Sequence, residues 1–300
     1  MGKREFTNEL QKNGIAFSTY EPMSRHTTFK IGGNADVFVL PKCEEELIFC
    51  VKTAEKCSIS FCIIGNGSNL LVSDDGIEGA VICLLNMKEI KISGDTAVVS
   101  AGQSLMSFCM TLQRKGLSGL EFAYGIPGTV GGAVYMNAGA YGGEIKDRIV
   151  SVRYLDKSGK ICVLDREQMR LGYRNSIFQG NGGIILSAEF RLNKDDSDKI
   201  LERMNEYLSR RKEKQPVDLP SAGSTFRRPE GSFAGTLIEK SGLKGEKIGG
   251  AQVSEKHAGF VVNTGGATSR DVFSLIEKIQ AKVLNDSGIK LQTEVIFIGR

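Results

Sequence analysis

Glycine is the residue type that most constrains how this chain can fold. The 300 residues contain 36 glycines but only 6 prolines. Without a side chain, glycine lets the backbone adopt left-handed turns or approach another group closely. An excess of glycine without proline therefore indicates backbone held close to something else rather than a low-complexity chain. The glycines are densest in residues 116–143, and a shorter cluster follows an apolar segment at 60–64.

The shorter cluster is Ile64-Gly65-Asn66-Gly67-Ser68-Asn69, directly after a predicted strand at 60–64. Glycines in such a loop allow several backbone N–H groups to point at one spot, and a nest of this kind can hold a pyrophosphate. The string is not the GxGxxG fingerprint, and no P-loop lysine follows it. A tight turn with no ligand is an equally simple interpretation of this loop alone.

The longer glycine-rich loop runs from Tyr124 to Ala140. Pro127 is suited to a position near a helix start, which puts Gly131, Gly132 and Ala133 in the first turns. We expect this helix start to offer a bare surface and free N–H donors to an anion. Glycine within a helix costs roughly 0.5–1 kcal/mol relative to alanine, which a large ligand nearby would explain. The alternative is a helix crossing packed through glycine. Two such loops, about 60 residues apart, imply a long ligand with a diphosphate.

Charge and histidine content argue against two classes of function, nucleic-acid binding and metal binding by several histidines. There are 39 Lys and Arg against 35 Asp and Glu, a net charge of +4. This surplus is too small for a nucleic-acid-binding protein, in which a basic domain with a one-sided patch is expected. The only histidines are His26 and His257, so a multi-histidine metal centre is nearly excluded and we expect no metal.

The seven cysteines are odd in number and form no CxxC pair. This pattern favours reduced, buried thiols in a cytosolic protein over a disulfide framework. Cys43, Cys50 and Cys57 are spaced by seven along a predicted helix, so we interpret them as small core residues on one face.

No export or membrane signal is recognised. The first six residues are charged and lack the apolar core of a signal peptide. The longest apolar runs, such as residues 80–85, fall far short of the ~18 residues that a spanning helix needs. We expect a cytoplasmic protein without a membrane segment.

Hydrophobic periodicity predicts a mixed architecture. Helices are expected at 44–57, 103–115, 197–211 and 270–286, and strands at 36–40, 60–64, 79–85, 148–155, 160–164, 184–192 and 293–298. Residues 216–220 resemble a linker. Because strands and helices do not alternate regularly, as they would in a doubly wound sheet, the pattern favours the α+β class.

A series of motifs, in this order and spacing, resembles the UDP-N-acetylenolpyruvoylglucosamine reductase family of flavoenzymes. They are Arg25-His26-Thr27-Thr28-Phe29-Lys30-Ile31-Gly32-Gly33, the two glycine-rich loops, Gly172-Tyr173-Arg174-Asn175-Ser176, Ala222-Gly223-Ser224-Thr225-Phe226, Lys247-Ile248-Gly249-Gly250-Ala251, His257-Ala258-Gly259-Phe260-Val261-Val262-Asn263 and Glu294. The likeness covers about residues 24–299. So many ordered motifs are not expected by chance.

The resemblance implies a two-part FAD-binding domain of the vanillyl-alcohol-oxidase (PCMH) type and a smaller α+β substrate-binding domain. The first FAD subdomain would comprise residues 1–85, joined by the C-terminal strand 290–300. The second would comprise residues 86–214, and the substrate-binding domain 215–289. FAD would be bound non-covalently, because the family pattern does not require a covalent link to His26.

The resemblance also implies an NADPH-dependent oxidoreductase that forms UDP-N-acetylmuramate for peptidoglycan. Its partners would be the UDP-sugar enolpyruvyl ether and NADPH, with no nucleic acid or membrane, and we expect a monomer. The residues expected to bind FAD come from the motif with Thr28 and from the two loops. They are Thr28, Ile64, Gly65, Asn66, Gly67, Ser68, Asn69, Gly128, Thr129, Gly131, Gly132, Ala133, Asn137, Gly139 and Ala140.

By the same resemblance, Arg174, Ser224 and Glu294 are the catalytic residues. Arg174 and Glu294 would face the substrate carboxylate, and Ser224 would donate the proton. A planar guanidinium suits a carboxylate, and Glu294 suits this place if it is protonated or shares a proton with the developing enol. From the sequence alone, Arg174 could also be a surface ion-pair residue and Ser224 a turn cap, and in most proteins a glutamate placed like Glu294 would simply face outward.

Further substrate contacts are expected from Tyr173, Arg227, Lys247 and His257 together with the catalytic three. Arg228, Lys240 and Lys256 are other basic candidates for phosphate contacts, and Tyr141 could line the sugar or flavin side. The family commonly has Leu-Glu-Pro-Glu-Val at its last motif, where this chain has Leu291-Gln292-Thr293-Glu294-Val295. Without the proline the backbone before Glu294 is less constrained.

Two rival functions fit the same residues. One is a flavin oxidase of an alcohol or hydroxy acid, which would reduce oxygen with its own substrate and ignore NADPH. The other is a non-catalytic nucleotide-sugar binding protein without a visible flavin spectrum. The joint presence of Arg174, Ser224 and Glu294 disfavours the second rival.

Overall fold

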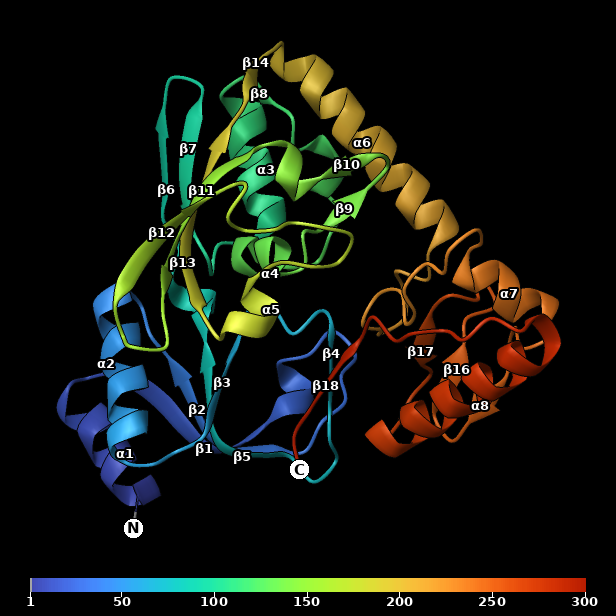
Figure 1. Ribbon diagram of the computed structural model, residues 1–300, viewed down its shortest axis with the longest axis horizontal. Helices are drawn as coiled ribbons and strands as arrows, with labels where there is room; N and C mark the ends of the chain where they lie inside the picture. Colours follow the sequence, from blue (N-terminus) through green and yellow to red (C-terminus); the bar gives the residue numbers. More distant parts are fainter. Residues whose placement is uncertain (1) are drawn as a thin grey trace. The chain divides into compact units, whose positions relative to one another are not determined.

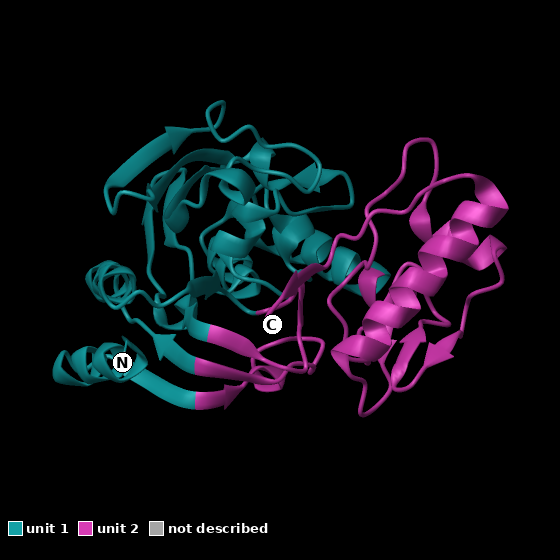
Figure 2. Cartoon of the chain, turned by 60° about the horizontal axis from the view of Figure 1, so that its bottom comes forward, with its two compact units in different colours: residues 1–19, 37–66, 79–210 teal, residues 20–36, 67–78, 211–300 magenta. Residues whose placement is uncertain are grey.

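The computed structural model describes residues 2–300 and divides into two compact units. Unit 1 comprises residues 2–19, 37–66 and 79–210, and unit 2 comprises residues 20–36, 67–78 and 211–300 (Figure 2). Each unit has its own hydrophobic core. The division cuts the first glycine-rich loop, so that Gly65 and Asn66 belong to unit 1 and Gly67, Ser68 and Asn69 to unit 2.

The first sheet has four strands in the order β1-β2-β5-β3 (Figure 1). Its strands are β1 (Ala16–Pro22), β2 (Asn34–Leu40), β3 (Phe61–Ile64) and β5 (Ile77–Cys83). Strands β3 and β5 are parallel, with Ile64 opposite Cys83. Helices α1 (Gly2–Lys12) and α2 (Glu44–Lys56) bury their apolar faces in the core of unit 1. The first glycine-rich loop therefore begins at the carboxyl end of a parallel strand at the edge of this sheet, of which only Ile64 is buried.

The second sheet lies in unit 1 and has five antiparallel strands in the order β12-β11-β13-β7-β6. Helices α3 (Leu105–Arg114) and α4 (Val130–Tyr135) pack against it, and the rings of Phe108 and Phe190 lie 5.4 Å apart. Helix α6 (Ser197–Lys214) follows these strands (Figure 1). The strands are β6 (Ile90–Ser93), β7 (Thr96–Ser100), β11 (Ile149–Leu155), β12 (Ile161–Asp165) and β13 (Ile184–Arg191); shorter elements are β8 (Leu117–Ser118), β9 (Gly139–Ala140), β10 (Gly143–Glu144), β14 (Asn193–Lys194) and α5 (Phe178–Asn181).

Unit 2 contains a three-stranded sheet in the order β15-β16-β17 with helices α7 (Ala234–Lys240) and α8 (Ser269–Ser287). The strands are β15 (Lys247–Ile248), β16 (Ala251–Val253) and β17 (Val261–Asn263). Helix α8 starts with a capping box, in which Thr268 Oγ1 accepts from the N–H of Asp271; such a box satisfies donors at a helix start. Separately, β4 (Leu70–Val72) pairs in parallel with β18 (Ile296–Ile298). The first glycine-rich loop therefore leads directly into a strand beside the end of the chain.

The structure confirms the predicted helices and strands to within a few residues, with one shortened strand. The strand expected at 293–298 is β18, which begins only at Ile296. The reason is that Thr293 pairs elsewhere, in an isolated antiparallel bridge to Phe226. The sequence analysis missed the seven-residue strand β1, the β6–β7 hairpin and the short strands of unit 2. Apart from β1, these strands have two to five residues, which contain too few alternations to be recognised. The three-part domain division remains a prediction.

One prediction about the cysteines is wrong. Cys50 and Cys57 are buried, but Cys43 is exposed. Cys43 is the residue before α2 and has an extended backbone, with φ −144° and ψ 174°. A residue outside the helix does not follow the helical period, so its spacing from Cys50 does not fix the direction of its side chain. All seven cysteines are unpaired by disulfides in the structure.

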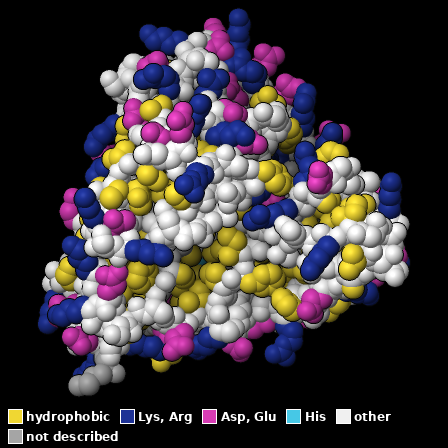
Figure 3. All heavy atoms as spheres, in the orientation of Figure 1, with side chains coloured by type: hydrophobic (Ala, Val, Ile, Leu, Met, Phe, Trp, Pro, Cys, Tyr) yellow, Lys and Arg dark blue, Asp and Glu magenta, His cyan; other side chains and the backbone are white. Residues whose placement is uncertain are grey.

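Acidic and basic side chains are interspersed on the face shown in Figure 3. This mixture agrees with the small net charge of +4. Within residues 2–300, no helix is both long enough and apolar enough to cross a membrane.

Candidate functional site

The two glycine-rich loops meet in unit 1. The side-chain amide of Asn66 donates to the carbonyl of Pro127 at 3.2 Å. A Cβ placed on Gly65 would lie 2.3 Å from Oγ1 of Thr129, so only glycine allows this approach. The structure thus brings together two segments that the sequence assigned to one ligand.

Backbone donors remain available in the first loop. Within residues 2–300, the N–H groups of Gly65, Asn66, Gly67 and Ser68 donate to no other group of the protein. Gly67 is buried and has a left-handed φ of 60°, and a Cβ there would lie 2.1 Å from the carbonyl oxygen of His26. Backbone donors without a protein partner are satisfied by water or a ligand. This loop therefore fits the predicted diphosphate nest.

The second loop differs from the sequence prediction in one respect. The expectation of free N–H donors at the start of α4 is wrong. The N–H of Val130 donates to the carbonyl of Gln103 at 2.9 Å, and that of Gly131 to the carbonyl of Ala101 at 2.8 Å. The N–H of Gly132 donates to the capping hydroxyl of Thr129 at 3.3 Å. The segment between β7 and α3 crosses this helix start and supplies the carbonyl acceptors.

The two glycines of α4 have different surroundings. A Cβ on Gly131 would lie 2.8 Å from the Cβ of Ala101, so Gly131 serves helix packing. A Cβ on Gly132 would meet only Oγ1 of Thr129, at 3.5 Å, and would otherwise point into open space. Gly132 is therefore the position in this helix where a missing side chain leaves room for a ligand.

These two positions give a matched test of the cofactor surface. We expect Gly131→Ala to lower the melting temperature of the FAD-free protein, because the new methyl group collides with Ala101. We expect Gly132→Ala to keep or raise that temperature, since alanine favours a helix by about 0.5–1 kcal/mol. The same substitution should weaken FAD binding about tenfold or more, equivalent to about 1.4 kcal/mol. Thermal unfolding and FAD titration measure both effects, and unchanged FAD affinity in Gly132→Ala would remove Gly132 from the cofactor surface.

Asn137 is completely buried and organises the end of the second loop. Its side-chain amide donates to Oε2 of Glu144 at 2.8 Å and to the carbonyl of Gly172 at 2.9 Å. Its side-chain oxygen accepts from the N–H of Lys146 at 2.9 Å. The hydrogen bond from the Lys146 ammonium group lowers the pKa of Glu144 below its usual value. These bonds fix the position of Gly172, where the motif containing Arg174 begins.

Arg174 lies against the second loop. Its guanidinium Nη2 donates to the carbonyl of Gly139 at 3.2 Å, and its Cζ lies 5.2 Å from the centroid of the Tyr173 ring. Gly172 and Asn175 exchange backbone hydrogen bonds across a tight turn, in which Arg174 has a left-handed φ of 51°. This conformation is uncommon for a residue with a side chain and occurs often at functional sites.

One residue that contacts this turn adds to the sequence analysis. The side-chain amide of Gln179 donates to the carbonyls of Arg174 and Tyr135, both at 3.0 Å. The sequence analysis missed Gln179, because a glutamine five residues after Arg174 has no local signature; its role follows only from the folded turn. Tyr141, the candidate for the sugar or flavin side, stacks its ring on that of Tyr207 with centroids 4.9 Å apart.

In unit 2, the structure brings the segment of Ser224 beside Glu294. The N–H of Glu294 donates to the carbonyl of Thr225 at 2.8 Å, and Phe226 pairs with Thr293. Thr225 is buried, and its hydroxyl accepts from the N–H of Val261 at 2.9 Å. Thr225 and Glu294, far apart in the sequence, are thus neighbours through backbone pairing, and Ser224 directly precedes Thr225. Arg174 belongs to unit 1, where it contacts the second glycine-rich loop.

Thr28 and Asn69 hold these segments of unit 2. The hydroxyl of Thr28 donates to the carbonyl of Ser221 at 2.7 Å. The side-chain amide of Asn69 donates to the carbonyl of Glu294 at 3.1 Å. The sequence assigned both residues to the cofactor, which remains a prediction; in the structure each side chain contacts the backbone of a segment predicted to be catalytic.

His257 is half-buried beside α7. Its Nδ1 accepts from the N–H of Gly259 at 3.1 Å, and its ring meets that of Phe260 edge-on at 5.0 Å. Burial lowers the pKa of His257 below its usual value. Near pH 7 the ring is therefore neutral, and its remaining polar atom, Nε2–H, is a hydrogen-bond donor.

The other basic candidates are distributed over unit 2. The N–H of Arg227 donates to the carbonyl of Gln292 at 2.8 Å, and Lys247 lies on β15. The guanidinium of Arg228 lies 4.6 Å from the ring centroid of Phe233. The ammonium group of Lys256 donates to the carbonyl of Lys212. Which of them contacts a phosphate remains a prediction.

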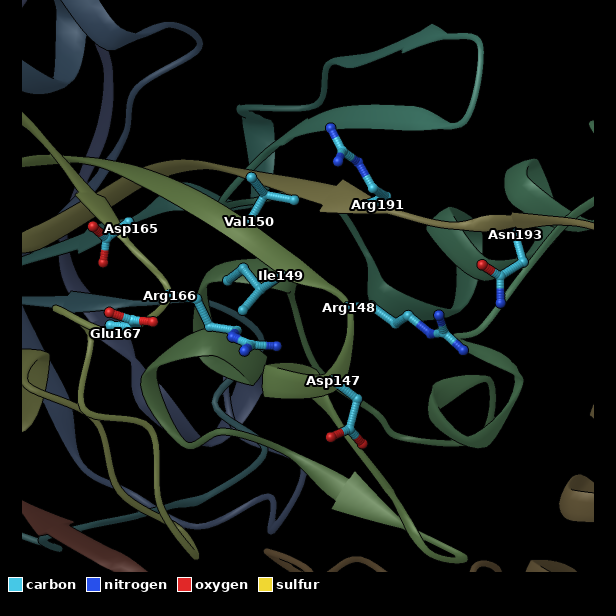
Figure 4. Close-up of a pocket in the computed structure, with 9 residues that line it drawn as sticks. All are labelled: Asp147, Arg148, Ile149, Val150, Asp165, Arg166, Glu167, Arg191 and Asn193. Atoms are coloured by element: carbon cyan, nitrogen blue, oxygen red, sulfur yellow. The ribbon is translucent and has the colours of Figure 1, made fainter.

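A depression of about 580 Å³ on unit 1 contains none of the predicted site residues. The guanidinium groups of Arg148, Arg166 and Arg191 on its walls point in different directions (Figure 4). Acidic side chains lie among them, so the depression offers no convergent anion site. Its lining residues are Asp147, Arg148, Ile149, Val150, Asp165, Arg166, Glu167, Arg191 and Asn193. In residues 2–300, no group of three or more His, Cys, Asp and Glu side chains is arranged to hold a metal ion.

Comparison with known proteins agrees with this arrangement. The family model for the C-terminal domain of UDP-N-acetylenolpyruvoylglucosamine reductase matches residues 215–298, and that for an FAD binding domain matches residues 35–165. The chain is 50% identical over 295 residues to UDP-N-acetylenolpyruvoylglucosamine reductase of Clostridium botulinum (strain Hall), covering 98% of this chain and 96% of that protein.

Solved structures are also similar to this chain. The crystal structure of UDP-N-acetylenolpyruvylglucosamine reductase from Thermus caldophilus matches with a TM-score of 0.81 and 33% identity, over 94% of this chain and 98% of that chain. A berberine bridge enzyme variant, a reticuline dehydrogenase, matches with a TM-score of 0.51 and 18% identity, over 64% of this chain and 44% of that chain. The second likeness concerns the fold alone. Together the matches confirm the expected α+β class with an FAD-binding domain of the vanillyl-alcohol-oxidase type.

Proposed function

This chain belongs to the UDP-N-acetylenolpyruvoylglucosamine reductase family, and on that premise we propose that it converts UDP-N-acetylenolpyruvoylglucosamine to UDP-N-acetylmuramate with NADPH and bound FAD. The observation that carries the proposal is the hydrogen bond between the N–H of Glu294 and the carbonyl of Thr225. It joins the segments of two predicted catalytic residues, Ser224 and Glu294, in unit 2. The product would serve peptidoglycan synthesis.

The residues of unit 1 and the first loop fit FAD. Unpartnered N–H groups from Gly65 to Ser68 suit its diphosphate, and the open face of Gly132 leaves room beside the helix. FAD held by these residues would supply hydride-transfer chemistry between NADPH and the terminal carbon of the enolpyruvyl double bond. Side chains of this protein would stabilise the negative charge that develops on the substrate and would donate the proton.

Arg174 and Glu294 would act on the carboxylate side of the substrate. Hydride addition to the terminal carbon leaves negative charge on the adjacent carbon and its carboxylate, as an enolate. Preorganised donors aimed at developing charge stabilise it, and the planar fork of Arg174 can donate two hydrogen bonds to one carboxylate. Glu294 would share a proton with the same group. The tight turn that holds Arg174 in a left-handed conformation supports this role, since a fixed backbone limits the directions of its side chain.

Ser224 would complete the reaction by donating its hydroxyl proton to the carbon that carries the carboxylate. One hydride and one proton then convert the enolpyruvyl ether to a lactyl ether. The protein supports a fixed hydroxyl here, because neighbouring Thr225 is bonded through its N–H to the carbonyl of Gly259 and through its carbonyl to Glu294. A weak acid is effective only when it is held against the basic carbon.

Anaerobic spectroscopy of the purified protein tests the proposed function. We expect a flavin absorbance spectrum that is bleached by NADPH and restored by UDP-N-acetylenolpyruvoylglucosamine. Flavin absorbance that ignores NADPH but is bleached by an alcohol or hydroxy acid would establish the oxidase rival. A colourless protein that stays so after FAD is added, yet binds UDP-sugars, would establish the binding-protein rival. The monomeric state and the cytoplasmic location remain predictions.

A further inference from the structure

Asn69 ends the first glycine-rich loop and contacts the predicted catalytic glutamate. Its side-chain amide donates to the carbonyl of Glu294 at 3.1 Å, and its own carbonyl accepts from the N–H of Ile296 at 2.9 Å. We infer that Asn69 is a positioning residue, which fixes Glu294 and thereby links the cofactor loop to the proton-transfer half of the reaction. This inference rests on the proposed function and adds a role that the sequence did not assign to Asn69.

The segment around Glu294 lacks the family's proline and is held by hydrogen bonds on both sides. Gln292 and Thr293 stand where the family commonly has Glu-Pro, so the local φ angles are not restricted by a ring. On one side, the carbonyl of Gln292 and the N–H of Glu294 bond to the segment of Arg227 and Thr225, both at 2.8 Å. Beyond Glu294, Asn69 supplies the bonds to the two peptide groups on either side of Val295.

An asparagine is suited to this role. It bonds at once through its backbone carbonyl and its side-chain donor, so it bridges the peptide groups on both sides of Val295. An aspartate of the same shape has no side-chain donor at neutral pH and would repel the carbonyl of Glu294. A serine is shorter by one heavy atom and would not reach the same carbonyl without movement of the backbone.

The position of Asn69 is set by the loop itself. Gly67, two residues earlier, is held against the carbonyl of His26 with a φ that favours glycine, and its own carbonyl accepts from the N–H of Thr28 at 3.4 Å. After Asn69, the chain continues as β4, in which Leu70 pairs with Ile296. The loop that offers donors to the cofactor is therefore continuous with the contact that holds Glu294.

The experiment separates the two half-reactions in Asn69→Ala and Asn69→Asp. We expect the rate of flavin bleaching by NADPH and the FAD content to stay within twofold of the unchanged protein. Reoxidation by the UDP-sugar should slow by about 10²-fold, the cost of a misplacement near 1 Å. The loss should fall on the rate at saturating sugar rather than on the sugar concentration for half-saturation.

A double substitution provides the decisive readout. If Asn69 acts through Glu294, then Asn69→Ala added to Glu294→Gln should slow reoxidation no further, because coupled residues are not additive. Fully additive losses would overturn the inference. So would a loss of FAD content that accounts for the slower reoxidation, since Asn69 would then serve the cofactor.

A matched control lies in the same segment. The side-chain amide of Gln280 donates to the carbonyl of Leu291 at 2.9 Å, three residues before Glu294. Gln280→Ala removes an equivalent bond and should leave reoxidation within about twofold; an equal loss in this variant would mean general loosening and would also overturn the inference. If the unchanged protein is not reoxidised by the UDP-sugar, the proposed function fails instead, and the two failures are distinguishable.

Discussion

Replacing Ser224 by alanine is expected to stop sugar reduction while leaving flavin reduction intact. The hydroxyl is the proposed proton donor to the substrate carbon, and a positioned general acid contributes about 10²–10⁴ in rate. Reoxidation of the reduced flavin by UDP-N-acetylenolpyruvoylglucosamine should therefore slow by about that factor. Bleaching by NADPH should be unchanged, because the proposed hydride transfer from NADPH to flavin uses no proton from Ser224. Stopped-flow absorbance measures the two steps separately.

Ser221→Ala is the matched control for this prediction. Ser221 lies three residues earlier in the same segment, and its carbonyl, not its hydroxyl, accepts the bond from Thr28. We expect this variant to keep both half-reactions. If Ser224→Ala also keeps both at normal rates, another group is the acid. If it loses bleaching as well, Ser224 serves the fold or the cofactor.

Replacing Arg174 by lysine is expected to slow flavin reoxidation by about 10²–10³, the usual cost of losing a donor that stabilises developing negative charge. Lysine keeps the positive charge but has no planar fork, so it cannot give two parallel hydrogen bonds to a carboxylate. Lysine also lacks the Nη2 atom that donates a hydrogen bond to the carbonyl of Gly139. Single-turnover reoxidation at saturating sugar measures the effect.

Arg170 provides a closely matched control for Arg174. It is an exposed arginine four residues earlier and has nearly the same left-handed φ, 48° against 51°. Arg170→Lys should therefore change backbone strain to the same small extent without affecting reoxidation. Equal rates in Arg174→Lys and the unchanged protein would show that a single positive charge is sufficient, and would contradict the two-bond role.

The glycines of the two loops show which features of the cofactor site could be predicted from the sequence. The order and content of the two glycine-rich loops predicted that both approach one ligand, and the contacts of Gly65 and Asn66 with the second loop agree with this. The prediction of free donors at the start of α4 failed because acceptors from Ala101 and Gln103 satisfy them. No local sequence pattern predicts that the segment with Ala101 and Gln103, about 30 residues earlier, will cross the start of α4.

By itself, the sequence determined the α+β class, the main helices and strands, the family and the motifs that carry its chemistry. These follow from periodicity and from residue types at fixed spacing, which are local properties of the chain. Only the tertiary structure decided that Asn69 contacts Glu294, that Glu294 pairs beside Ser224, that Gln179 and Asn137 hold the turn of Arg174, and that Cys43 faces solvent. Such contacts join residues across loops whose closure depends on the whole packing of each unit, so neither spacing nor composition specifies them.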